Sequence, residues 1–328
     1  DNSTDKTLSA MLRMAVIAQT QEAFEKAPVE TDEQRAAKAA QEGLVKQLFV
    51  ELKRDFKPSD LPPYTLVKLG MHLANTSQPE ESIAYFDEIL DPSEPNPVRK
   101  QARINGMSKY RKNAVFGKAV ALGRSKDNAK VDTAIKMMRD ELSKEESSSN
   151  QDRKAMEDAQ YNLVKFTAAR QDWPAVIAAA EKYRADKSYK KNLPEVLFLQ
   201  GQAYLKQNEP DKALVCFMNI TGADYKGLVK WSAPAMLAQM DTLWNRNKMS
   251  QGTGKQPSDR YVAWRTGSQY VQLLDTPANR KRMTAEDSDL LNQVKDKVSR
   301  FGSDPAVSQE RSDIAAYEAA IRSARGQK

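Results

Sequence analysis

The chain of 328 residues has almost none of the residue types that build disulfide, metal or histidine-dependent sites. Its single cysteine, Cys216, excludes an intrachain disulfide and a zinc site made of several thiolates. Its single histidine, His72, excludes histidine pairs and multi-histidine metal sites. Glycine and proline are scarce as well, with 13 and 15 residues. We therefore expect no catalytic residue, no cofactor and no metal site, and we predict that the protein is not an enzyme.

Long apolar runs are also missing, because no stretch reaches the roughly 18 uninterrupted apolar residues that a bilayer-spanning helix needs. The nearest, residues 8–18, contains Arg13 and is typical of an amphipathic helix rather than a signal peptide. We expect no transmembrane segment. The chain starts at Asp1 rather than Met, which favours a processed periplasmic or secreted protein over a cytoplasmic one.

One short motif is superficially similar to a phosphate-binding loop, at Gly252–Lys255. Met249 stands where that loop needs its first glycine, and Gln256 replaces the Ser or Thr that would meet magnesium. The segment is therefore expected to be an exposed loop, and no small-molecule substrate is expected.

What the sequence contains in abundance are helix formers, chiefly alanine, leucine, lysine, glutamate and glutamine, with few β-branched runs. We expect a helix over 6–26 and a second that ends near Phe56, followed after residue 248 by helices near 258–275, 284–301 and 305–324. The first helix carries an apolar stripe that we expect to be packed, formed by Leu8, Met11, Leu12, Ala15, Val16 and Phe24. The side chains expected to cap the other end of the fold are Tyr261, Trp264, Tyr270, Leu273 and Leu274.

Between these ends the chain repeats a pattern of small and aromatic residues. Gly70 precedes Phe86 by 16 residues, and Gly201 precedes Phe217 by the same spacing. Two helices can cross closely where one has a glycine, and a phenylalanine from the other fills the adjoining gap. Gly106 lies 36 residues after Gly70 and is expected at the equivalent place, as is Val164, 37 residues before Gly201; the pattern is then expected to restart with Trp231, Ala235 and Ala238. Each hairpin of this kind leaves an apolar face that the next hairpin must cover.

Segment 197–220 resembles a tetratricopeptide repeat. The residues that carry the resemblance are Leu197, Gly201, Tyr204, Ala213 and Phe217, while Gln200 and Ile220 depart from the pattern. Weaker matches extend the resemblance over about 59–247. It implies an α-α superhelix and a non-enzymatic scaffold that holds a protein partner in a concave groove, and bacterial cell-envelope assembly proteins of this family provide an analogy.

The resemblance also implies which residues line the groove, because the first helix of each unit faces it. These residues are Tyr64, Met71 and Asn75 in the first unit, Lys100, Arg103, Met107 and Arg111 in the second, Tyr161 and Lys165 in the third, and Phe198, Gln202 and Lys206 in the fourth. Aromatic, methionine and basic side chains suit an extended peptide with some negative charge. The alternative is that many of them are ordinary surface or packing residues.

Charge is distributed unevenly along the chain. Segment 99–126 has nine basic residues and no acid, and segment 79–94 has six acids and no base. The net charge is +7, so the rest of the chain sums to 7 − 9 = −2 without the basic segment. Neighbouring helices could let the two segments neutralise each other. Alternatively, the basic segment could bind an anionic polymer; nucleic acid is disfavoured because the aromatic residues of a stacking platform are missing.

We therefore predict an all-α fold, an α-α superhelix of helical hairpins with helical extensions at both ends. The expected domains are an N-terminal hairpin over 1–58, the repeat region over 59–247, and a loop with a helical cap over 248–328. The expected function is that of a scaffold or adaptor for a protein or peptide. Two alternatives stay open: a binder of an anionic polymer or nucleic acid through 99–126, and an accessory subunit of an enzyme complex.

Overall fold

The computed structural model describes residues 2–26, 32–76, 78–146, 153–222, 229–252 and 256–326. It divides into two compact units, one up to Phe166 and one from Thr167 onward, and each is described by itself. This division falls inside the predicted repeat region, and the predicted domain boundaries stay a prediction. Residues 253–255 of the rejected phosphate-loop match lie outside the described ranges.

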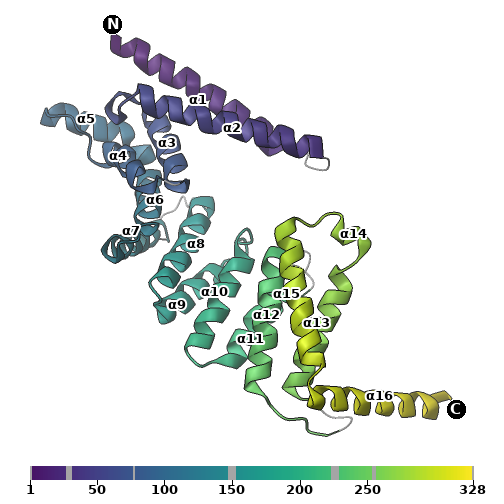
Figure 1. Cartoon of the computed structure of the whole chain (residues 1–328). Coiled ribbons are helices and arrows are strands. Elements are labelled where there is room, and N and C mark those ends of the chain that lie inside the picture. Colours follow the sequence, from purple (N-terminus) through teal and green to yellow (C-terminus); the bar gives the residue numbers. More distant parts are fainter. Residues whose placement is uncertain are drawn as a thin grey trace. The chain divides into compact units, whose positions relative to one another are not determined.

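Every regular element in the described ranges is a helix, so the predicted all-α class is confirmed (Figure 1). The elements of unit 1 are α1 (Asn2–Lys26), α2 (Asp32–Asp55), the short 3₁₀ helix η1 (Pro58–Asp60), α3 (Pro63–Asn75), α4 (Pro79–Leu90), α5 (Pro97–Met107), the 3₁₀ helix η2 (Ser108–Tyr110), α6 (Arg111–Gly123), α7 (Asn128–Glu146) and most of α8 (Arg153–Ala169). The elements of unit 2 are α9 (Trp173–Ala185), α10 (Leu193–Lys206), α11 (Pro210–Thr221), α12 (Val229–Arg246), α13 (Asp259–Leu274), α14 (Pro277–Arg280), α15 (Ala285–Gly302) and α16 (Pro305–Gly326).

Helices that follow each other in the chain also pack on each other within each unit. In unit 1, α1 packs on α2, α3 on α4, α4 on α6 and α6 on α7. In unit 2, the series of contacts runs from α9 through α10, α11 and α12 to α13. This sequential packing of helical hairpins is that of an α-α solenoid, so the predicted architecture is confirmed.

Local sequence explains where these hairpins turn. Pro79 opens α4 and Pro210 opens α11, at first-turn positions where the missing N–H costs no helical hydrogen bond. Asn208 has a φ of 58° in the turn between α10 and α11. Asparagine tolerates this left-handed conformation better than most residues, and it commonly ends a helix there.

At two helical hairpins a phenylalanine ring of the second helix lies on a glycine of the first. A Cβ added to Gly70 of α3 would lie 2.8 Å from the ring of Phe86, and one added to Gly201 of α10 would lie 2.6 Å from the ring of Phe217. Both rings are fully buried. The predicted wedging of these glycines against these phenylalanines is therefore confirmed.

The predicted position of Gly106 is wrong. No atom beyond the neighbouring backbone of its own helix lies within 4 Å of where its Cβ would be, and it is exposed on α5. Gly117 of α6 takes the role instead, with a Cβ position 2.3 Å from the ring of Phe86. An additional helix, α5, separates the two hairpins, so the equivalent glycine follows Gly70 by 47 residues rather than 36. A search for a constant period selects the wrong glycine for this reason.

The predicted apolar stripe of α1 is wrong as well. The buried residues are Ala10, Met14 and Ile17, which lie on the opposite side of the helix. The residues of the predicted stripe that are exposed instead are Leu8, Met11, Leu12, Ala15 and Val16, while the side chain of Phe24 lies outside the described residues. Since α1 is apolar on both sides, its sequence does not decide which side faces α2.

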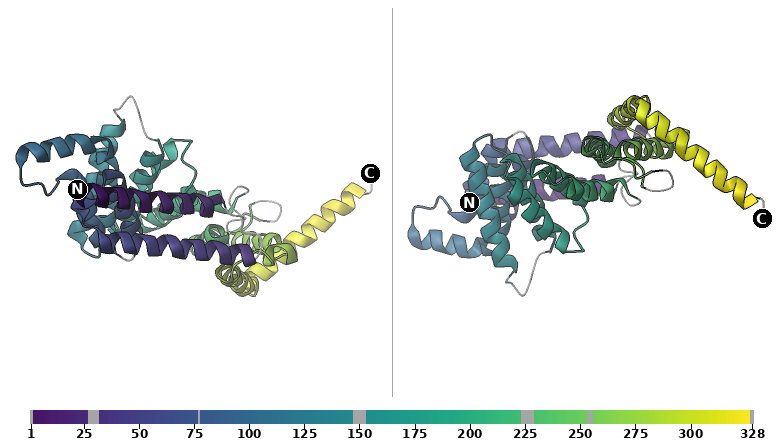
Figure 2. Two further views of the ribbon diagram at one scale, coloured as in Figure 1. Left: turned by 90° about the horizontal axis from the view of Figure 1, so that it is seen from above. Right: turned by 90° about the horizontal axis from the view of Figure 1, so that it is seen from below.

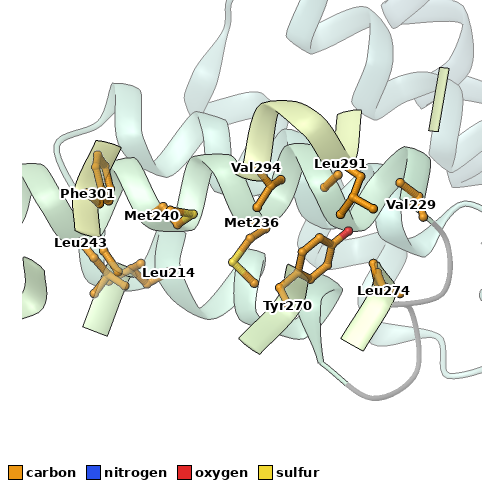
Figure 3. Close-up of a cluster of buried hydrophobic side chains, with 12 residues drawn as sticks. Leu214, Val229, Met236, Met240, Leu243, Tyr270, Leu274, Leu291, Val294 and Phe301 are labelled. Carbon is orange, nitrogen blue, oxygen red and sulfur yellow. The ribbon is translucent and has the colours of Figure 1, made fainter. Parts of the chain in front are cut away.

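The C-terminal helices α13 and α15 pack on α12 around a hydrophobic core of unit 2, as predicted. Figure 3 shows that core, in which Met236 and Met240 of α12 lie near Tyr270 of α13 and Val294 of α15. The Tyr270 hydroxyl and Ser232 Oγ share a hydrogen bond of 2.7 Å, and burial raises the pKa of Tyr270 to about 12. Tyr261, Tyr270 and Leu274 are buried as expected, whereas Leu273 is exposed.

Gly117→Ala is predicted to destabilise unit 1 by up to about 2 kcal/mol. The alanine gains about 1 kcal/mol of helix propensity, but its methyl group must displace the buried ring of Phe86, and overpacking of this kind costs about 1–3 kcal/mol. Thermal and urea unfolding measure the change.

The matched control is Gly106→Ala on α5, where the added methyl group meets nothing. This variant should be stabilised by up to about 1 kcal/mol. Equal effects of the two substitutions would contradict the assigned glycine contacts.

Candidate partner-binding surface

Nine of the twelve predicted groove residues belong to unit 1 and three to unit 2, and the residues of each unit are described by themselves. Tyr64, Met71 and Asn75 share one side of α3, because they are spaced at seven and four residues. Tyr64 is 43% exposed, with Lys68 Nζ 5.6 Å from its ring centroid. Met71 is half-buried and Asn75 is exposed. These three residues form an accessible face.

The groove residues predicted for the second repeat, which also belong to unit 1, do not continue this face. Lys100, Arg103 and Met107 belong to the additional helix α5, and Met107 is buried. Only Arg111 lies on α6, at the place relative to Gly117 that Tyr64 has relative to Gly70. The α6 equivalent of Met71 is Lys118, which the sequence analysis missed as a groove position because it placed the repeat on Gly106.

Arg103 has a structural task in unit 1. Its Nη2 lies 3.1 Å from Oε1 of Glu88, a carboxylate that is only 5% exposed, and it donates a hydrogen bond to the Ser59 carbonyl. Ser93 donates to the other Glu88 oxygen from its backbone N–H and from its hydroxyl. A buried carboxylate needs such partners, since desolvation of an isolated charge costs several kcal/mol.

Other charges of the basic segment also face the acidic segment. Lys118 pairs with Asp87 at 2.6 Å and Lys100 with Asp91 at 2.5 Å. Arg124 donates to the carbonyl oxygen of Ala74 near the end of α3. Together with the Arg103 contact, these pairs confirm that the two segments neutralise each other in part, and they reduce the positive charge available to an anionic partner.

In the third predicted position, on α8, Tyr161 and Lys165 are half-buried neighbours. Lys165 Nζ lies 5.2 Å from the Tyr161 ring centroid, a cation–π geometry. The pair is spaced by one helical turn and therefore shares one side of the helix.

The face of unit 2 is formed by Phe198, Gln202 and Lys206, spaced by four residues along one side of α10. Gln202 and Lys206 are exposed. Phe198 is half-buried, with its ring centroid 5.9 Å from that of Phe217. Trp231 of α12 packs against the same core cluster and is half-buried, so the structure adds an aromatic residue that the groove prediction did not include.

Behind this face the core of the hairpin contains a polar side chain, that of Gln200. Gln200, which departs from the repeat pattern, is fully buried and accepts a hydrogen bond from Arg184 Nη1 at 2.9 Å. Its amide nitrogen lies 3.5 Å from the Tyr204 hydroxyl, and Cys216 Sγ lies 3.7 Å from its oxygen. Burial raises the pKa of Cys216 to about 11, so the thiol stays protonated at neutral pH. The network satisfies a buried amide and offers no reactive thiolate.

The described residues hold no cluster of three histidine, cysteine or carboxylate side chains suited to a metal ion. None of the helices in the described ranges has both the length and the apolar character required to cross a bilayer. Comparison with protein-family models finds no family that matches this chain, and comparison with curated proteins finds no match.

Arg103→Met is predicted to destabilise unit 1 by about 2–4 kcal/mol, because it leaves the buried Glu88 carboxylate without its cation. Arg99→Met, on the same helix but exposed, should change stability by less than about 0.5 kcal/mol. Urea unfolding separates the two. If the two residues are paired, Arg103→Met should lose less stability in a Glu88→Gln background than in the unchanged chain. An equal loss of stability in both backgrounds would contradict the pairing.

The stability of unit 1 is predicted to fall as the pH drops from about 7.5 to about 5.5. The His72 ring stacks on Phe49 with centroids 4.1 Å apart, and burial, together with nearby Lys46, lowers the pKa of His72 below its usual 6.5. The unfolded chain therefore binds a proton before the folded chain does, which favours unfolding as the pH falls.

Melting temperatures across this range measure the effect. His72 is the only histidine, so His72→Phe should remove most of the dependence while keeping the stacked ring. A variant with an unchanged pH profile would assign the dependence to other groups.

Proposed function

We propose that this chain is a tetratricopeptide-like scaffold that binds a protein or peptide segment on the exposed side of the first helices of its hairpins. The repeated placement of a phenylalanine ring on a glycine supports this reading, since it is how such hairpins nest. The resulting faces combine a half-exposed aromatic ring with polar side chains, as at Tyr64 on α3 and at Phe198 and Gln202 on α10.

Charge supports a peptide over an anionic polymer. Three bases of segment 99–126 are paired with acids of segment 79–94, and a phosphate backbone would have to compete with these contacts. Lys206 on α10 and Lys68 on α3 are exposed, which suits a peptide with some negative charge. A role as the binding subunit of an enzyme complex is compatible with the same faces. A periplasmic or secreted location remains part of the proposal.

The proposal predicts that a peptide selected by display on the whole chain loses about tenfold or more in affinity when Gln202→Ala and Lys206→Ala are combined. Both residues are exposed on α10, so the fold should be unaffected. The matched control combines Val215→Ala with Met218→Ala, two exposed residues of the adjacent second helix α11.

Fluorescence anisotropy with the selected peptide measures both affinities, with salt varied as a second axis. Weaker binding by the Val215 and Met218 control variant would contradict the proposal. So would binding that depends steeply on salt and is abolished when the charges of Arg99 and Lys126 are reversed.

A further inference from the structure

A separate cleft lies in unit 2 at the base of α16, away from α10. Its volume is about 670 Å³, within the range of about 300–1,000 Å³ that is typical of ligand sites. Residues within 247–252 and 257–258 after α12, the first half of α13 and one side of α16 line it. Figure 2 shows that α16 then extends beyond the other helices of its unit.

The start of α16 is firmly held. Val307 is buried, and Arg311 places its guanidinium 5.2 Å from the Trp264 ring centroid. The carboxylate of Glu310 accepts hydrogen bonds from the backbone N–H of Ser258, at 2.8 Å, and from the Ser258 hydroxyl. The wall of the cleft is therefore fixed before any ligand arrives, which lowers the entropy cost of binding.

The cleft offers an apolar surface that the chain itself leaves partly uncovered. Ile314 and Tyr317 lie one turn apart on the lining side of α16, and Tyr317 is 43% exposed. Met249 of the opposing loop is 78% exposed, and methionine adapts its shape to an incoming apolar group.

The α16 wall also carries three carboxylates, from Glu310, Asp313 and Glu318, and no basic side chain. Asp313 accepts a hydrogen bond from Gln309, and within the described ranges neither Asp313 nor Glu318 has an ion pair. The opposite wall has two arginines, each held on an aromatic ring: Arg260 over Trp244, where it also lies 3.6 Å from Asp304, and Arg265 near Tyr261.

From this arrangement we propose that the cleft binds a peptide segment in which a lysine or arginine stands next to an apolar residue. The apolar group packs on Ile314 and Tyr317, and the cation meets Asp313 and Glu318. Three carboxylates outnumber the two arginines of the lining, and Arg260 already lies beside Asp304, so the cleft disfavours phosphate-bearing ligands. The apolar wall gives a peptide more contact than a small cation receives. This site is independent of the α10 face, and its ligand has the opposite charge.

The test uses the whole chain and a fluorescein-labelled peptide of sequence GSKLKLKSG, with binding measured by anisotropy at physiological salt. We expect saturable binding with a Kd on the order of 10–100 μM, and no saturation by the acidic peptide GSELELESG or by the less apolar GSKSKSKSG. Asp313→Asn combined with Glu318→Gln should raise the Kd about tenfold or more, and Tyr317→Ala should do the same.

The matched control combines Asp289→Asn with Asp296→Asn, which removes the same charge from exposed positions of α15 and should leave the Kd unchanged. The α10 variants should also have no effect, so the failure of one site can be distinguished from the failure of the other. Thermal unfolding checks that each variant is folded.

Three results would each overturn the proposal: no binding up to about 1 mM peptide, equal weakening by the α15 control, or equal binding of GSKSKSKSG. Spermidine is tested as a competitor at a concentration that supplies as many positive charges as the peptide does. If it displaces the peptide at that concentration, the cleft would be assigned to small cations instead.

Discussion

The contact between a phenylalanine ring and a glycine backbone is the constraint on which the hairpin packing depends. Phe86 illustrates this most directly, because its ring lies on Gly70 of its own hairpin and on Gly117 of the next first helix. One side chain therefore fixes both the closure of a hairpin and the approach of its neighbour. A Cβ at either glycine would lie within 2.8 Å of the ring, so the ring or the helices would have to shift in a closely packed interior.

A second constraint concerns charge. Unit 1 contains an acidic segment, 79–94, which covers α4 and the residues after it, and its side chains pair at short distances with basic residues of α5 and α6. Exposed pairs of this kind add little stability, but the pair between Arg103 and buried Glu88 differs because one partner has lost its water. The basic segment thus contributes to the fold. Some of its positive charges, which the sequence alone would offer to an anionic ligand, are already paired with carboxylates of unit 1.

The two proposed binding surfaces follow from what packing and pairing leave available. On α10 an aromatic ring lies half-buried beside exposed polar groups, which suits a partner recognised by shape and modest charge. At α16 an apolar stripe lies beside carboxylates that have no ion pair within the described ranges, which suits the opposite charge. The two proposals together assign the chain two partner segments of unlike charge.

The sequence by itself determined the helical class, the hairpin between Gly70 and Phe86 and the one between Gly201 and Phe217, and the three C-terminal helices. These features are encoded locally, by helix propensity and by a spacing of 16 residues. Only the tertiary structure decided that α5 interrupts the repeat, that α1 turns Met14 and Ile17 inward rather than Leu8 and Leu12, and that Arg103 serves a buried carboxylate. It also decided that Glu310 ties α16 to Ser258, 52 residues earlier, and so forms the cleft. A helix with apolar residues on two sides can bury either side, and a charged residue can pair with any of several partners. The sequence is compatible with more than one of these arrangements, and the packing of distant segments selects one of them.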